Sequence, residues 1–119
     1  MLEIFQIPVL NDNYIYLIID AKSGKTACVD PALHDPVIEK LEELDKKLDF
    51  ILNTHHHNDH VGANLQLQKR YKCEIVGNEK DKARIPGISI FVNEGDTFKL
   101  GDSECRVIEV SGHTLGHIC

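Results

Sequence analysis

Residues 50–60 of the chain read FILNTHHHNDH, a short apolar run followed at once by four of its seven histidines. The apolar residues predict a buried strand, and the polar residues then lie where that strand ends. In a helix, His55 and His57 would lie about 200° apart around the axis. In an extended chain, alternate side chains point the same way, with Cα atoms about 6.7 Å apart. We therefore expect His55 and His57 to share a metal ion, while His56 points away and is not a ligand.

Further metal ligands are predicted on either side of this pair. Asp59 and His60 lie on the turn into the next helix, where they can face the same cleft and hold a second ion. His113 follows a strand and sits in a glycine-containing turn, which makes it the candidate third ligand beside His55 and His57. Three histidines and one open position are the ligand set of a catalytic zinc site. Imidazoles combined with one carboxylate also suit iron or manganese.

Three other polar residues have less defined roles. Asp30 ends a predicted strand before Pro31, where it either caps the turn or hydrogen-bonds a ligand histidine, and both readings stay open. His34 is interpreted as a surface or capping residue. His117 is interpreted as a supporting or packing residue rather than a direct ligand.

The hydrophobic pattern predicts an α/β fold with a mixed sheet. Asp35 is expected to cap a helix that has Pro36 at its first position. Strand–helix–strand steps favour parallel strand pairing with helices packed on the sheet. Strands are expected over residues 2–9, 14–19, 25–29, 50–52, 73–76 and 105–110, a second helix over 61–71, and strand-like sequence from 88 onward.

Composition limits the classes of function. The 119 residues suit one domain, residues 1–119, and 42% of them are hydrophobic. Thirteen Lys and Arg against 19 Asp and Glu give a net charge of −6, which argues against nucleic acid or an anionic membrane as partner. Glu3 stands where a secretion signal has basic residues, so we expect a cytoplasmic location. The four cysteines form no Cys-x-x-Cys pair and are expected to be reduced thiols.

Several motifs resemble those of a known family. Residues 54–60 resemble the signature of the metallo-β-lactamase superfamily, and residues 111–117 look like its next motif. Residues 10–16 and 61–64 are similar to motifs of glyoxalase II, the hydroxyacylglutathione hydrolase family. The resemblance implies a four-layer αβ/βα sandwich. These residues look like its first half, a mixed sheet with helices on one face.

The resemblance also implies an activity. Family members hydrolyse S-(2-hydroxyacyl)glutathione, such as S-D-lactoylglutathione, to glutathione and a 2-hydroxy acid with hydroxide generated at the metal. By resemblance, His55, His57 and His113 bind the first metal, and Asp59 and His60 bind the second. Asp59 is also the expected catalytic residue, because a placed carboxylate can orient the nucleophile and take its proton. Two zinc ions are expected in the full-length enzyme, with iron or manganese as other options.

The chain stops before other features of the family. A later Asp that bridges both metals, a later His and a helical region that binds glutathione are not found in the 119 residues. Two divalent ions bring a charge of +4, and Asp59 with one hydroxide supplies only −2, so one tight metal site is expected here. The chain alone is expected to have little activity. Two alternatives remain: a persulfide dioxygenase-like oxidoreductase with mononuclear iron, and a non-catalytic metal-binding fragment that needs a partner, including a second copy at its open sheet edge.

Overall fold

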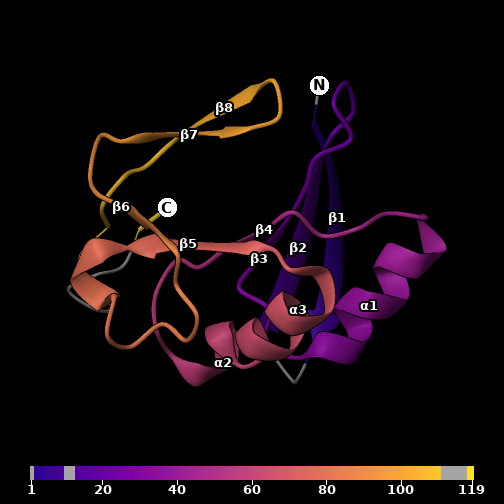
Figure 1. Ribbon diagram of the computed structural model, residues 1–119, viewed down its shortest axis with the longest axis horizontal. Helices are drawn as coiled ribbons and strands as arrows, with labels where there is room; N and C mark the ends of the chain where they lie inside the picture. The colour runs from indigo at the N-terminus through magenta and orange to yellow at the C-terminus, as the bar shows by residue number, and fades with distance from the viewer. Residues whose placement is uncertain (1, 10–12, 111–117) are drawn as a thin grey trace.

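The computed structural model describes residues 2–9, 13–110 and 118–119, without the side chains of Asn58 and Asp59. Its centre is a six-stranded sheet in which the strands follow one another in chain order (Figure 1). A separate two-stranded sheet is formed by β7 and β8. The strands are β1 (Leu2–Val9), β2 (Asn13–Asp20), β3 (Thr26–Val29), β4 (Phe50–Leu52), β5 (Glu74–Asn78), β6 (Ile90–Val92), β7 (Thr97–Leu100) and β8 (Ser103–Arg106).

The central sheet is mixed, as the sequence predicts. Strands β1, β2 and β3 are antiparallel neighbours, and β3 to β6 are parallel. Gly24 has φ 79° in the tight turn between β2 and β3, a backbone conformation that glycine adopts without strain. The parallel pairs instead need longer connections, which are helical between β3 and β4 and between β4 and β5. The carboxyl ends of β3, β4 and β5 therefore lie at one edge.

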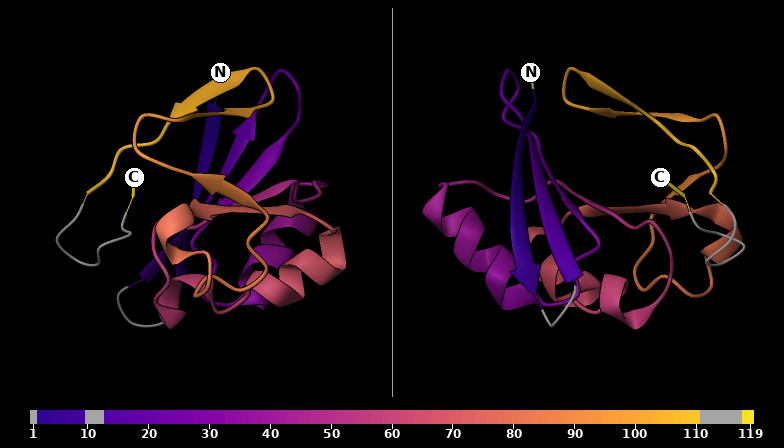
Figure 2. Two further views of the ribbon diagram at one scale, coloured as in Figure 1. Left: turned by 60° about the vertical axis from the view of Figure 1, so that its left-hand side comes forward. Right: turned by 180° about the vertical axis from the view of Figure 1, so that it is seen from behind.

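The helices cover one face of the sheet (Figures 1 and 2). They are α1 (His34–Glu43), α2 (Asn58–Val61) and α3 (Asn64–Tyr71), with the 3-10 turn η1 (Glu79–Asp81) after β5. Within the described residues, no helix is both long and apolar enough to cross a bilayer. Alternate strand residues meet the apolar side of the helices in the main core, which includes Ile15, Leu17, Cys28, Val37, Leu41, Ile51, Leu67 and Ile75.

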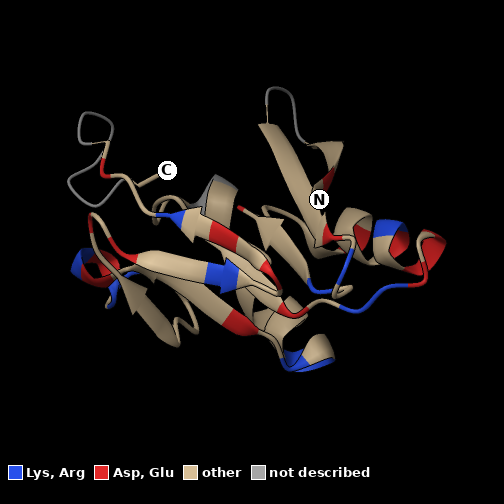
Figure 3. Ribbon diagram, turned by 90° about the horizontal axis from the view of Figure 1, so that it is seen from above, with Lys and Arg blue, Asp and Glu red and all other residues tan. Residues whose placement is uncertain are grey.

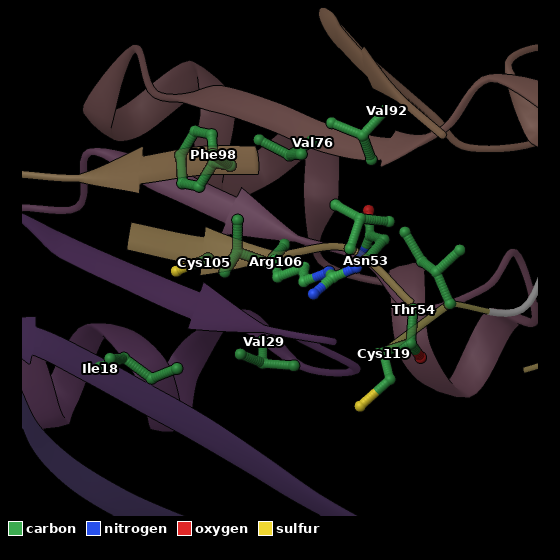
Figure 4. Close-up of a pocket in the computed structure, with 13 residues that line it drawn as sticks. Ile18, Val29, Asn53, Thr54, Val76, Val92, Phe98, Cys105, Arg106 and Cys119 are labelled. Atoms are coloured by element: carbon green, nitrogen blue, oxygen red, sulfur yellow. The ribbon is translucent and has the colours of Figure 1, made fainter. Parts of the chain in front are cut away.

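The hairpin of β7 and β8 lies over the opposite face (Figure 2). Phe98 on the hairpin packs edge-on against Phe50 of β4, with ring centroids 4.9 Å apart. Between hairpin and sheet there is a mainly apolar cleft of about 270 Å³ (Figure 4). Ile4 and Tyr14, at the β1 side of the sheet, are exposed. One face of the sheet thus carries the main core, and the other is only partly covered.

Asp20 joins this hairpin to the central sheet. Its side chain is buried, and it accepts hydrogen bonds from the Ser23 amide and hydroxyl, the Asp102 amide and the Ser103 hydroxyl. These donors, with the Ser23 hydroxyl first among them, hold the pKa of the Asp20 carboxyl well below its usual range. One carboxylate therefore links the turn after β2 to the turn between β7 and β8.

Three local predictions were wrong. The predicted helix over residues 61–71 is interrupted at Gly62, and the Ala63 amide instead donates to the Pro31 carbonyl at 2.9 Å. Asp35 does not cap α1, because the helix begins at His34, two residues earlier than predicted, and Leu33 is the N-cap. The strand expected to reach residue 110 ends at Arg106. Each error concerns an end or a break of an element, which are the parts least fixed by the local pattern.

Candidate metal centre

Residues 54–60, called the histidine segment below, follow the carboxyl end of β4. The Asn53 amide still donates to Val76 of β5 at 2.9 Å, and the Asp30 amide donates to Leu52 at 3.0 Å. Asp30 and Thr54 therefore follow two adjacent parallel strands at the same edge of the sheet. Ligands of open α/β sheets bind at this edge, because the loops that follow the strands gather there.

Three imidazoles meet beyond this edge. The ring centroids of His55 and His57 are 4.8 Å apart, and those of His55 and His60 are 4.1 Å apart. His57 has extended backbone, with φ −63° and ψ 145°, and α2 starts directly after it. The rings of His55 and His57 lie near each other, as the sequence predicts, although the backbone bends at Thr54 and His55 instead of continuing as a strand. The first turn of α2 then brings His60 against His55.

A buried carboxylate supports two of these rings. Asp30 Oδ1 accepts the Thr54 amide at 2.8 Å, and Oδ2 accepts the Thr54 hydroxyl at 2.6 Å. Asp30 Oδ2 also lies 3.1 Å from His60 Nδ1, and Thr54 Oγ1 lies 2.9 Å from His55 Nδ1. The hydrogen bond to Nδ1 of His55 leaves its Nε2 to face a metal, whereas the contact of Asp30 with His60 is one of ion-pair distance. Of the two readings that the sequence leaves open for Asp30, the contact with a candidate ligand histidine is observed.

The donor set fits a divalent transition metal. One donor atom each of Asp30, His55 and His60 can be chosen so that all lie within 4.8 Å of one another. Both Asp30 oxygens already accept hydrogen bonds from Thr54, so this carboxylate is better placed to orient the histidines than to bind the ion. Imidazole nitrogens beside a carboxylate suit zinc, iron or manganese.

Two buried side-chain amides, those of Asn53 and Asn64, hold the end of the histidine segment in place. Asn53 Nδ2 donates to the His60 carbonyl at 3.1 Å, and Asn64 Nδ2 donates to Asn53 Oδ1 at 2.7 Å. Asn64 Nδ2 also donates to the Pro86 carbonyl at 3.1 Å. The end of β4, the end of α2 and the start of α3 are thereby tied together, which limits how far His60 can move.

Two histidines lie outside the cluster, as the sequence predicts. His56 lies 3.5 Å from Asp81, measured between Nδ1 and Oδ2, on the side of η1. His34 is partly exposed at the start of α1, with its Nδ1 2.8 Å from Asp35 Oδ1. Neither belongs to the group formed by Asp30, His55 and His60, and the predicted ligand His57 does not belong to it either.

Part of the predicted site is outside the described residues. This applies to His113, to His117 and to the side chain of Asp59, whose backbone belongs to α2. The third ligand of the first metal and the carboxylate of the second therefore stay predictions.

Sequence reasoning missed three residues that support the site, Asn53, Thr54 and Asn64, and also the buried Asp81 beside His56. The signal for Asn53 and Thr54 was their place between an apolar strand and the histidines. Asn64 stands in an apolar stretch, where a lone amide often has a buried partner. Asp81 had no comparable signal, because its burial depends on how the segment after β5 folds back.

The apolar cleft is separate from the imidazoles. Its lining comes from the sheet and the hairpin, and among the described residues only Asn53 and Thr54 link it to the histidine segment (Figure 4). In the view of Figure 3, acidic and basic residues intermingle on α1 and on the hairpin rather than forming a basic surface. The chemistry of the site therefore resides in the histidine segment.

The fold and this arrangement of histidines define a class of metal-binding α/β proteins. The model of the metallo-β-lactamase superfamily matches residues 10–119, and the chain belongs to that superfamily. In solved structures, it is similar to ETHE1 from Myxococcus xanthus, with a TM-score of 0.83 and 29% identity over 98% of this chain and 52% of the other. The mixed sheet with helices on one face is thus the first half of the family's αβ/βα sandwich.

Particular relatives narrow the comparison. The chain is 51% identical to the hydroxyacylglutathione hydrolase of Methylococcus capsulatus, over 99% of this chain and 46% of that protein. It is 50% identical to the hydroxyacylglutathione hydrolase of Rhodospirillum rubrum, over 98% of this chain and 46% of the relative. The chain therefore spans about half the length of the curated relatives it matches.

Proposed function

We propose that this chain is the metal-binding half of a hydrolase that cleaves glutathione thioesters. The substrate class is S-(2-hydroxyacyl)glutathione, such as S-D-lactoylglutathione, and the products are glutathione and a 2-hydroxy acid. The main support is the contact of three imidazoles at a strand end in a chain about half identical to proteins called hydroxyacylglutathione hydrolase.

The residues have distinct proposed roles. His55, His57 and His113 hold one metal ion, and Asp59 and His60 contribute to a second. When bound, the metal supplies a water acidic enough to ionise near neutral pH and a Lewis acid for the thioester carbonyl. Zinc is the proposed ion, and the same donors suit iron or manganese.

The protein's own groups position the reaction. Asp30 fixes the Thr54 hydroxyl, which contacts Nδ1 of His55, and Asp30 also lies 3.1 Å from Nδ1 of His60, so both rings have a placed polar neighbour before a metal binds. Asp59 is proposed to orient the nucleophile and accept its proton. Because a thiol has a pKa of about 8.5, the glutathione thiolate leaves readily and no strong general acid is needed.

Metal analysis tests the proposal on this chain. We expect about one tightly held metal per 119 residues after desalting, and loss of that metal in His55→Ala and His57→Ala. His34→Ala is the matched control, because His34 contacts Asp35 at the start of α1 instead of the cluster. Two tightly held metals per chain would refute the single-site expectation, and retention of metal by His55→Ala would refute the site.

The activity requires its own test. A protein that joins these residues to the remaining half of the relatives' length is expected to hydrolyse S-D-lactoylglutathione, and the 119-residue chain to show little turnover. An enzyme-like rate from the 119-residue chain would show that the other half is dispensable. No turnover by the longer protein loaded with zinc would refute the substrate class.

A second candidate function is a persulfide dioxygenase-like oxidoreductase with mononuclear iron. The observation in its favour is that the imidazole and carboxylate donors suit iron as well as zinc. Bound iron together with oxygen consumption on glutathione persulfide would identify it. Self-association through the open sheet edge and a cytoplasmic location both stay predictions from the sequence.

A further inference from the structure

His56 stands between two candidate ligands and faces the other way. Its Nδ1 atom lies 3.5 Å from Oδ2 of Asp81, and the Asp81 side chain is only 3% exposed. Both of these atoms are buried and neither makes a hydrogen bond among the described residues, so their contact is one of ion-pair distance. His56 and Asp81 are therefore each other's nearest polar partner on this side of the histidine segment.

A buried carboxylate such as Asp81 needs a partner. Removing a charge from water is costly unless an opposite charge or a hydrogen-bond donor compensates. Arg84 offers a second positive group at 3.8 Å, but its side chain is 62% exposed, so water weakens that pair. His56 is the more buried neighbour and the one that belongs to the histidine segment.

Asp81 is held in a fixed turn. Its carbonyl accepts the amides of Arg84 and Ile85 at 2.8 and 3.1 Å, and Asn78 Oδ1 accepts the Lys80 amide at 3.0 Å at the start of η1. These hydrogen bonds leave the backbone around Asp81 little freedom. A side chain that contacts Asp81 is thus attached to a rigid part of the molecule.

The contact between His56 and Asp81 restrains the backbone of the histidine segment. The ring of His56 lies edge-on to that of His57, with centroids 5.2 Å apart. His56 is joined to His55 and His57 by planar peptide bonds, so holding its side chain limits the movement of both neighbours. A fixed His56 therefore restrains its two neighbours, whose own rings lie 4.8 Å apart between centroids.

We propose that His56 and Asp81 form a positioning pair that aims His55 and His57 at the metal ion. Neither residue touches the ion, and the pair acts by holding the segment between β4 and α2 against η1. This inference rests on the metal centre of the proposed function and assigns it two further residues.

Metal affinity in a double-mutant cycle tests the pair. His56→Ala, Asp81→Ala and the double variant of the 119-residue chain are titrated with zinc against a chelator, and Co²⁺ absorption reports the coordination geometry. We expect each single variant to bind about tenfold more weakly, the lower end of the usual effect of removing a supporting contact. The double variant should lose no more than either single variant, because the two residues act through one contact.

Two further comparisons separate positioning from general stability. Asp81→Asn keeps an oxygen that can accept from His56 and should restore most of the affinity and the Co²⁺ spectrum, even if Asp81→Ala folds poorly. His34→Ala and Asp35→Ala remove an exposed pair of the same residue types and should change neither readout. Circular dichroism and thermal melting of the metal-free proteins measure stability separately.

Several results would overturn the inference. Unchanged affinity and spectrum in both alanine variants would do so, as would a lower melting temperature without loss of affinity. Losses that multiply in the double variant would show that the residues act independently. If the unmodified chain binds no metal, the proposed metal centre itself fails, which is a different result from a chain that binds metal equally with and without the pair.

Discussion

Replacing Asp30 with alanine removes the acceptor on which the histidine segment depends. Asp30 accepts the Thr54 amide and hydroxyl and contacts His60, and its backbone has φ 51°. A buried amide without an acceptor costs about 1–3 kcal/mol. An alanine in the left-handed region costs a further 1–2 kcal/mol, roughly, whereas Asp adopts it more readily. We expect Asp30→Ala to lower the free energy of unfolding by about 2–5 kcal/mol.

The same change should weaken metal binding. Without the carboxylate, the Thr54 hydroxyl is free to rotate and His60 Nδ1 loses its neighbour, so two rings are no longer held. Removal of such a supporting group typically reduces metal affinity about 10- to 100-fold. Asp30→Asn is the matched variant, because asparagine keeps an acceptor oxygen and tolerates the left-handed backbone. It should lose clearly less of both quantities.

Urea unfolding of the metal-free proteins and zinc competition with a chelator measure the two effects separately. The reasoning is refuted if Asp30→Ala unfolds within about 0.5 kcal/mol of the unmodified chain, the range of an ordinary surface substitution. It is also refuted if zinc affinity is unchanged in a folded Asp30→Ala protein.

Three further predictions concern the rest of the chain. Gly101→Ala should lower the free energy of unfolding by at least about 1–2 kcal/mol, because Gly101 has φ 61° and a Cβ there would collide with the Ser23 hydroxyl. An unchanged urea midpoint would contradict this. Because the folded pKa of Asp20 is lowered, the contribution of its carboxylate to stability is complete above pH ~4 and is lost as the pH falls further. The urea midpoint of Asp20→Asn should therefore fall less than that of the unmodified chain between pH 6 and pH 3. Burial raises the pKa of the Cys28 thiol well above its usual value, so iodoacetamide at neutral pH should label the exposed Cys119 long before Cys28. Equal labelling rates of the two thiols, measured by mass spectrometry, would disprove this.

Strand and helix types were largely predictable, because they follow from local periodicity. The apolar run at residues 2–9 predicted β1 with its observed bounds, and residues 50–52 did the same for β4. The break at Gly62 was not predictable, because the Ala63 amide donates to Pro31, a residue more than thirty positions away. Contacts of that kind leave no mark on the periodicity of the helix itself.

For the site, the alternation of His55 and His57 was enough to predict that their rings approach each other. The two rings lie 4.8 Å apart between centroids, and residues two apart in sequence are near each other whatever the longer-range fold. The sequence also determined the family, since its histidine motif lies within the matched residues 10–119. Tertiary structure alone decided the supporting partners. Asp30 and Asp81 lie about 25 residues from Thr54 and His56 in the chain, and they meet them only because parallel strands bring their carboxyl ends together at one edge.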